Sequence, residues 1–315
     1  MRHDLTQTTT TASAPARPRA TEGALRRLGW TVLRPLASRL GGQERSRVLA
    51  PGAELAGLRE YQAGDDVRLI DWHVTARSDR PFVREAQAER ALDAWLLVDA
   101  SRSVDWGTAS CLKRERGEEL AALAWGLLAR HGNRVGALLF ADQPLAVAPP
   151  AAGEAGLRRM LAQLDSTPRQ VGRGRTDLGA ALTRAEVLLR RPSLIVIVSD
   201  LFVGPGWQRP LGRLARRHEI VAARLADPRD ADLPDVGVVA FEDPETGDQV
   251  LVDTGDAALR ARFAEAARAE AERVRHDLAR AGVEQIVVST AEELLPALAR
   301  FLALRRAGGH LPPVG

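Results

Sequence analysis

Several residue types are scarce in this sequence, and each shortage excludes a class of protein. Cys111 is the only cysteine, so the chain can form neither an internal disulfide nor a zinc site built on cysteines. No apolar run approaches the roughly 18 residues of a membrane-spanning helix, and the first residues lack the apolar core of a signal peptide. These shortages favour a cytoplasmic protein without a membrane span.

The sequence also has no large excess of charge of either sign. Lysine and arginine together number 44, against 41 aspartates and glutamates, which leaves a formal net charge of +3. Lys113 is the only lysine, so almost every cationic side chain is an arginine. A nucleic-acid-binding domain usually carries a marked basic excess on one face. We therefore expect no nucleic-acid partner.

From residue 94 onward, short apolar runs alternate with longer amphipathic stretches. The apolar runs predict buried strands at 94–99, 134–140, 193–199, 219–225 and 283–288. Helical spacing predicts helices at 109–131, 153–165, 208–217, 256–281 and 291–305, and one that begins at Thr176. Residues 144–147 are expected to pair with the second strand, and 236–241 with 249–252 as a hairpin. This alternation predicts a doubly wound α/β fold whose mostly parallel sheet is covered on both faces.

The remaining segments suggest four regions along the chain. Residues 1–22 are low in complexity and predict a disordered tail. Residues 23–90 are expected to hold a short amphipathic helix at 24–39 and a structured cap, in which an extended segment begins at Phe82. Residues 91–307 form the predicted α/β domain, and 308–315 a flexible C-terminus.

Oxygen-bearing side chains follow two of the predicted strands. Asp99, Ser101 and Ser103 come directly after the first strand, and Asp200 comes after the strand at 193–199. Thr176 adds a hydroxyl at a predicted helix start. Ligands in open α/β sheets bind outside the carboxyl ends of the strands, and hard oxygen donors suit Mg²⁺ or Mn²⁺. Because Asp and Ser are also common turn and cap residues, only the combination favours a divalent-metal site.

An enzyme is the first alternative to a binding protein. A phosphatase of the haloacid dehalogenase type needs a second aspartate where Ser101 stands, and a lysine, whereas Lys113 lies within the predicted helix at 109–131. The segment Gly172–Arg175 is too short for a phosphate-binding loop, and no histidine accompanies the two serines. The sequence contains no identifiable general base or nucleophile, which favours a binding protein. A metal-dependent hydrolase or phosphoesterase, or a structural protein with a vestigial site, remain alternatives.

Two groups of motifs resemble known families. The residues Asp99–Ser103, Thr176-Asp177 and Ser199-Asp200 resemble the metal-ion-dependent adhesion site of von Willebrand factor A domains. The upstream segments REYQAGDDVRLIDWHVTAR and FVREAQAER resemble the bacterial family called domain of unknown function number 58. This resemblance implies a von Willebrand A-like, Rossmann-like fold and a metal held by Asp99, Ser101, Ser103, Thr176 and Asp200. It also implies a partner, a MoxR-type AAA+ ATPase, which the protein serves as adaptor or co-chaperone.

Four further residues are candidates for partner binding. Arg102 lies between the two site serines, where small residues are commoner in such sites, and it can influence which anion approaches the ion. Asp65, Asp66 and Trp72 are candidates for a docking face, because tryptophan is a frequent anchor at interfaces. The alternative for the two aspartates is a structural cluster of ion pairs with neighbouring arginines.

Overall fold

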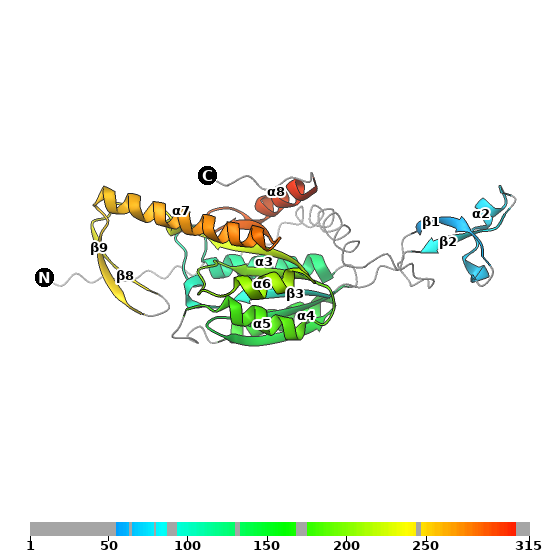
Figure 1. The fold of residues 1–315 in the computed structure, drawn as a ribbon, viewed down its shortest axis with the longest axis horizontal. Helices are drawn as coiled ribbons and strands as arrows, with labels where there is room; N and C mark the ends of the chain where they lie inside the picture. The colour runs from blue at the N-terminus through cyan, green and yellow to red at the C-terminus, as the bar shows by residue number, and fades with distance from the viewer. Residues whose placement is uncertain are drawn as a thin grey trace.

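The computed structural model describes residues 55–62, 65–78, 80–86, 93–129, 133–167, 175–243 and 247–306. The predicted tail at 1–22, the predicted helix at 24–39, the Gly172–Gly174 segment and the predicted flexible C-terminus lie outside these residues. Figure 1 shows the described elements, which form one six-stranded sheet with its helices and two small two-stranded sheets.

The first small sheet belongs to the predicted cap. Strand β1 (Leu55–Glu60) pairs antiparallel with β2 (Phe82–Ala86), and the short helices η1 (Val67–Leu69) and α2 (Trp72–Thr75) lie between them in the chain. The predicted extended segment that begins at Phe82 is present as β2. Strand β1 was not predicted, because its sequence LAGLRE lacks a clear two-residue alternation.

The six-stranded sheet confirms the predicted mostly parallel α/β fold. Its strand order is β10-β7-β6-β3-β4-β5, and only β5 runs antiparallel to its neighbour. The strands are β3 (Asp93–Asp99), β4 (Arg134–Phe140), β5 (Pro144–Ala151), β6 (Ser193–Ser199), β7 (Glu219–Ala226) and β10 (Glu284–Ser289). Each of the five predicted apolar runs is one of these strands, and β5 is longer than the predicted 144–147.

Helices cover both faces of this sheet. Alternate residues of β3 pack against the helices on opposite faces. Leu96 and Val98 pack in one apolar cluster, whereas Trp95 and Leu97 alternate with them and pack in the other. The first cluster includes residues of α3 (Lys113–Leu128), α4 (Gly153–Ser166) and α8 (Leu294–Arg306), and the second includes residues of α5 (Leu178–Leu188), α6 (Gln208–Ala215) and α7 (Ala257–Arg280). A central strand buried on both faces explains why β3 is a continuous apolar run.

The predicted hairpin between β7 and α7 is confirmed. Strands β8 (Val238–Glu242) and β9 (Gln249–Asp253) pair antiparallel in a sheet of their own. Figure 1 shows them in yellow beside the N-terminal end of α7. Leu251 and Val238 on this hairpin are largely exposed.

Helix α3 begins later than predicted, at Lys113 and not at residue 109. The preceding residues are held by the loops after other strands: the Thr108 amide and hydroxyl donate to Asp227, and the Ser110 amide donates to the Thr290 carbonyl oxygen. These tertiary contacts hold Thr108 and Ser110 in the loop before the helix, so α3 begins only after them.

None of the helices in the described parts of the chain combines the length and the apolar character that crossing a membrane requires. The longest of them, α7, has 24 residues and is rich in arginine and glutamate. The expected cytoplasmic location stays a prediction.

Candidate metal centre

The candidate site lies where the order of the strands reverses. After β3 the chain forms β4 on one side of it, and it later returns to form β6 on the other side. Such a switch point leaves a crevice outside the carboxyl ends of the two strands. Val98 of β3 is in register with Val198 of β6. Asp99 therefore leaves the sheet beside Ser199 and Asp200.

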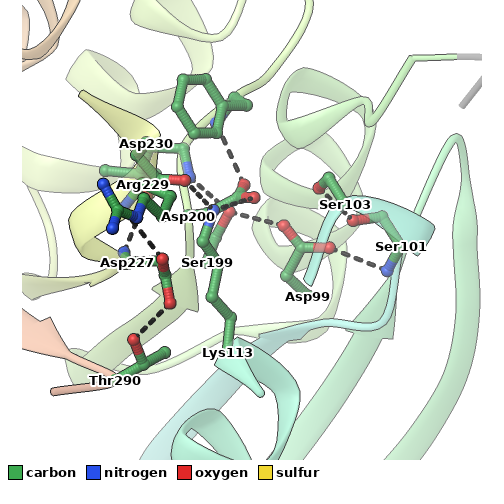
Figure 2. A network of polar contacts seen from close by, with 12 residues as sticks. Asp99, Ser101, Ser103, Lys113, Ser199, Asp200, Asp227, Arg229, Asp230 and Thr290 are labelled. Carbon is green, nitrogen blue, oxygen red and sulfur yellow. Dashed lines mark hydrogen bonds and ion pairs between the residues drawn. The ribbon is translucent and has the colours of Figure 1, made fainter. Parts of the chain in front are cut away.

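Asp99 is held by hydrogen bonds from both sides of this crevice, as Figure 2 shows. The Ser101 amide donates to its Oδ1 (2.9 Å), and the Ser199 hydroxyl donates to its Oδ2 (2.5 Å). The Ser101 and Ser103 hydroxyl oxygens are 3.0 Å apart. The short helix η2 (Arg102–Val104) turns the chain so that both serines lie on one side of the loop. Three of the predicted ligands therefore lie together.

Asp200 is buried beside them. Its Oδ1 accepts a hydrogen bond from the Phe202 amide (3.1 Å), whereas no hydrogen bond from the described residues reaches Oδ2. The next residue, Leu201, is buried and has a φ of 61°. A left-handed conformation costs a residue with a side chain on the order of 1 kcal/mol or more, and it persists only where the surroundings determine it. The backbone at Asp200 is therefore fixed by its tertiary contacts.

The two carboxylates disturb one another. Burial, and then the negative charge of Asp200, raises the pKa of Asp99 from 3.8 to about 7, although hydrogen bonds from Ser101 and Ser199 act in the opposite direction. An ionised Asp99 is thus unfavourable in the folded protein without a counter-charge. A cation between the two side chains would remove this penalty.

Thr176 is buried at the same edge of the sheet. Its carbonyl oxygen accepts a hydrogen bond from the Gly204 amide (2.9 Å), and the next amide, of Asp177, donates to the Ala141 carbonyl (2.8 Å). These bonds tie Thr176 to the loops that follow β6 and β4. The helix predicted to begin at Thr176 begins at Leu178, because Asp177 caps it by accepting from the Ala180 amide (2.8 Å).

Lys113 lies in a helix, as predicted, but at its first residue, and sequence reasoning did not place it beside the candidate site. Lys113 is the first residue of α3, and it is only 2% exposed. Its Nζ lies 2.8 Å from Asp230 Oδ1 and 3.5 Å from Asp200 Oδ2 (Figure 2). The rings of Trp106 and Phe202 lie about 5 Å away, at centroid distances of 5.1 and 5.0 Å. The one sequence signal was that this is the single lysine among 44 basic residues.

A second residue that the sequence did not point to is Asp227, which directly follows β7. It accepts hydrogen bonds from the Thr108 amide (2.7 Å), the Thr108 hydroxyl (2.5 Å) and the Thr290 hydroxyl (2.5 Å). Burial raises the pKa of Asp227, but these hydrogen bonds outweigh that effect and hold the pKa at about 2. Asp227 therefore joins the loops after β3, β7 and β10, and the helix η4 (Pro228–Asp230) begins beside it.

The predicted partner-binding residues divide between two places. Arg102 is exposed and lies between the two site serines in the chain. Asp65 and Asp66 accept hydrogen bonds from the amides of Gln62 and Arg68 in the small N-terminal sheet, and Trp72 there is 67% exposed. Figure 1 shows β1, β2 and α2, the elements around these three residues, apart from the six-stranded sheet.

The residues present fit a hard cation in their chemistry. Within the described residues, no three His, Cys, Asp or Glu side chains form a group that could hold a metal ion, so a site here needs the hydroxyls as well as the carboxylates. Two aspartates with neighbouring serine hydroxyls are the oxygen donors that Mg²⁺ and Mn²⁺ accept. Asp200 Oδ2 accepts no hydrogen bond from the described residues and has the Lys113 ammonium 3.5 Å away, and Asp99 and Asp200 repel one another; a divalent cation would satisfy both features.

Solved structures similar to this one include proteins with von Willebrand A domains. The conserved hypothetical protein BatB from Bacteroides thetaiotaomicron is 14% identical, with a TM-score of 0.45 over 70% of this chain and 100% of that chain. The SpRpn10 VWA domain is 14% identical, with a TM-score of 0.39 over 67% of this chain and 95% of that one. These scores are too low to support any conclusion about function.

Some proteins are more similar to this chain in sequence than these solved structures are. The uncharacterized protein Rv1480 of Mycobacterium tuberculosis and the uncharacterized protein Mb1516 of Mycobacterium bovis are each 40% identical over 291 residues, which is 91% of this chain and 91% of theirs. The family model described as protein of unknown function DUF58 matches residues 57–273, a range that runs from β1 into α7 and includes the candidate metal centre. The chain therefore belongs to the DUF58 family.

Proposed function

We propose that the protein is a divalent-metal-dependent protein–protein interaction module. In this proposal Mg²⁺ or Mn²⁺ is held by Asp99, Ser101, Ser103, Thr176 and Asp200. The observation that carries it is the meeting of two buried carboxylates and two serine hydroxyls at the switch point between β3 and β6. Neither a general base nor a nucleophile is identified among these residues, which favours binding over catalysis.

The chain's own side chains divide the work at such a site. Asp99 and Asp200 supply the negative charge, and Ser199 together with the Ser101 amide fixes the orientation of Asp99. Where the neutral oxygens of Ser101 and Ser103 coordinate the ion directly and the aspartates act through bound water, the ion would keep much of its positive charge. The bound ion would supply an open coordination position for a carboxylate of another protein.

The partner we propose is a MoxR-type AAA+ ATPase, for which the protein acts as adaptor or co-chaperone. The support for this partner is the resemblance of the upstream motifs and of the site motifs to their families. An Asp or Glu of the partner would complete the metal coordination. Exposed Arg102 next to the site, and exposed Trp72 in the small N-terminal sheet, are the proposed further contacts.

Ser101→Ala tests this function directly. The variant removes one hydroxyl from the site, and we expect it to weaken capture of the purified ATPase about tenfold or more, as chelation of metal by EDTA does for the wild type. Binding is measured by pulldown and by titration in the presence of Mg²⁺. Ser166→Ala is the matched control, because Ser166 is exposed at the end of α4 and, within the described residues, its hydroxyl donates to the Gln163 carbonyl of the same helix. Binding that resists both EDTA and Ser101→Ala contradicts the proposal.

A metal-dependent phosphoesterase is the alternative that one observation favours. Lys113 beside Asp200 places a cation in the crevice, which a phosphatase needs. Against it, Ser101 still occupies the position of the second aspartate, and the Lys113 ammonium is buried against Asp230. Turnover of generic phosphoester substrates that is lost in Asp99→Ala would decide for the enzyme. The absence of Mn²⁺ binding at millimolar metal would instead favour a vestigial structural site.

A further inference from the structure

Lys113 is in a position that a lysine does not usually occupy. It is buried, and it is the first residue of α3, where the positive end of the helix dipole disfavours a cation. Its neighbour Glu115 is the residue that suits this end, and it accepts a hydrogen bond from the Leu112 amide. Burial of an ammonium at such a place is tolerated only with close counter-charges. The counter-charges around Lys113 therefore determine what it does.

Those contacts connect the candidate metal centre to a carboxylate outside it. The Lys113 ammonium lies between Asp200, a proposed metal ligand, and Asp230, which belongs to η4 after β7. The shorter distance is to Asp230, at 2.8 Å against 3.5 Å. The faces of Trp106 and Phe202 cover the ammonium and keep water from it. The crevice thus contains a cation of the protein's own.

We propose that Lys113 is a built-in counter-cation that competes with the divalent ion for Asp200, and that Asp230 weakens this competition by drawing the ammonium away. This inference rests on the proposed function, since it needs a divalent ion at the site. A divalent ion bound by Asp200 has the ammonium as a near neighbour of like charge. In a buried crevice that repulsion is much stronger than in water. Metal affinity is therefore set below what the oxygen ligands alone would give.

The arrangement also explains how the protein tolerates the site without metal. Asp99 and Asp200 repel one another, and the ammonium is the nearest cation that offsets Asp200 among the described residues. Without Lys113, the metal-free protein has to bury these carboxylates with no counter-charge, and the divalent ion becomes their only compensation. Removal of the ammonium should accordingly make the fold depend on metal.

The test compares Mn²⁺ binding by the full-length wild type, Lys113→Met, Asp230→Asn and Arg114→Met, measured by calorimetric titration with MnCl₂. We expect Lys113→Met to bind about tenfold more tightly than the wild type and Asp230→Asn about tenfold more weakly, because the first removes a repelling charge and the second leaves the ammonium to Asp200 alone. Arg114→Met is the matched control. It removes a cation one residue along the same helix, whose ion pairs are with Asp105 and Glu118.

Thermal unfolding provides a second readout. Lys113→Met is expected to unfold at a lower temperature than the wild type in EDTA and to regain most of the loss in Mn²⁺, whereas the wild type gains little. If Lys113→Met does not fold in EDTA or in Mn²⁺, the affinity of Asp230→Asn decides: weaker binding supports the proposal, and equal or tighter binding overturns it.

The remaining outcomes separate this proposal from the proposed function. Equal Mn²⁺ affinities in all four proteins would overturn the competition and leave the metal site standing. No binding by either the wild type or Lys113→Met overturns the metal site and the competition together. Binding detected in Lys113→Met but not in the wild type supports both.

Discussion

At the scale of single residues, the buried aspartates at the carboxyl edge of the sheet are of two kinds. Asp227 is surrounded by donors, and hydrogen bonds from Thr108 and Thr290 outweigh its burial, so that its pKa is about 2. Asp99 has two donors, but burial, and then the charge of Asp200, raises its pKa to about 7. The same edge therefore holds one carboxylate that is stable as an anion and one that is not. An added cation would therefore stabilise the ionised form of Asp99 and is not needed for that of Asp227.

Asp227→Asn tests, through the pH dependence of stability, how much the ionised Asp227 carboxylate stabilises the fold. Because the pKa of Asp227 in the folded protein lies below its ordinary value of 3.8, the ionised carboxylate stabilises the fold above about pH 4, and this contribution disappears as the pH falls towards about 2. We expect Asp227→Asn to lower the free energy of unfolding by about 2 kcal/mol near neutral pH. Its difference from the wild type should shrink as the pH falls from about 4 to about 2.

Urea unfolding of both proteins at several pH values between about 6 and 2.5 measures this difference. Asp232→Asn is the control, since Asp232 is an exposed residue shortly after Asp227 and its ion pair among the described residues is with Arg229 at the surface. Surface pairs of this kind contribute little, so its effect should stay below about 0.5 kcal/mol. A loss in Asp227→Asn that is the same at every pH would show that packing, and not ionisation, is what Asp227 contributes.

At the scale of secondary structure, the sequence predicted the central strands better than the helix starts. The bounds of β4 and β6 agree with the predicted 134–140 and 193–199, because a strand buried on both faces is a continuous apolar run with polar residues at its ends. The start of α3 was predicted four residues too early. It is determined by hydrogen bonds from Thr108 to Asp227, 119 positions further along the chain, and from Ser110 to Thr290, 180 positions further along. No local sequence pattern encodes these contacts.

The same loop gives a prediction for Gly107. A β-carbon at this position would lie 2.5 Å from the Cys111 carbonyl oxygen and 2.8 Å from the Leu112 α-carbon, and backbone atoms have little room to move. The shift would disturb the bond from the Lys113 amide to the Trp106 carbonyl, where α3 begins. We expect Gly107→Ala to lower the free energy of unfolding by about 1–3 kcal/mol, as measured by urea denaturation.

The control for Gly107→Ala is the same substitution at Gly126 in α3. A β-carbon there would meet no atom within 4 Å, and alanine is favoured over glycine in a helix interior by roughly 0.5–1 kcal/mol. Gly126→Ala should therefore leave stability unchanged or raise it. Two glycines near one helix would then respond in opposite directions. A stable Gly107→Ala protein would mean that the loop before α3 relaxes easily and does not hold Lys113 in place.

At the scale of the whole molecule, the meeting of Asp99 and Asp200 was predictable and the contact with Lys113 was not. Adjacent parallel strands end at the same edge, so residues that follow two such strands meet there whatever their separation in the chain. The position of Lys113 depends on how the start of α3 is placed over β6, and that of Asp230 on the turn after β7. The positions of Lys113 and Asp230 result from tertiary packing, which the local sequence pattern does not predict.

The small N-terminal sheet provides the prediction that concerns the whole molecule. Trp72 on α2 is 67% exposed, so most of its side chain does not pack within the described structure. Protein interfaces often use tryptophan as an anchor. We expect Trp72→Ala to weaken binding of the ATPase by about 2 kcal/mol, or roughly thirtyfold, without changing Mn²⁺ affinity or thermal stability. Phe263→Ala, at a partly exposed aromatic residue on α7, is the control for general loss of aromatic surface.

Combining Trp72→Ala with Ser101→Ala shows whether both regions contact one partner. Trp72 lies on α2 and Ser101 in the loop after β3, so independent contacts with the same ATPase should give losses that add within about 0.5 kcal/mol. If the ATPase binds the metal centre alone, Trp72→Ala has no effect and the double variant equals Ser101→Ala. A loss in Trp72→Ala that disappears once Ser101 is changed would instead indicate that the small sheet acts through the metal centre. Only the additive result agrees with a partner that spans both.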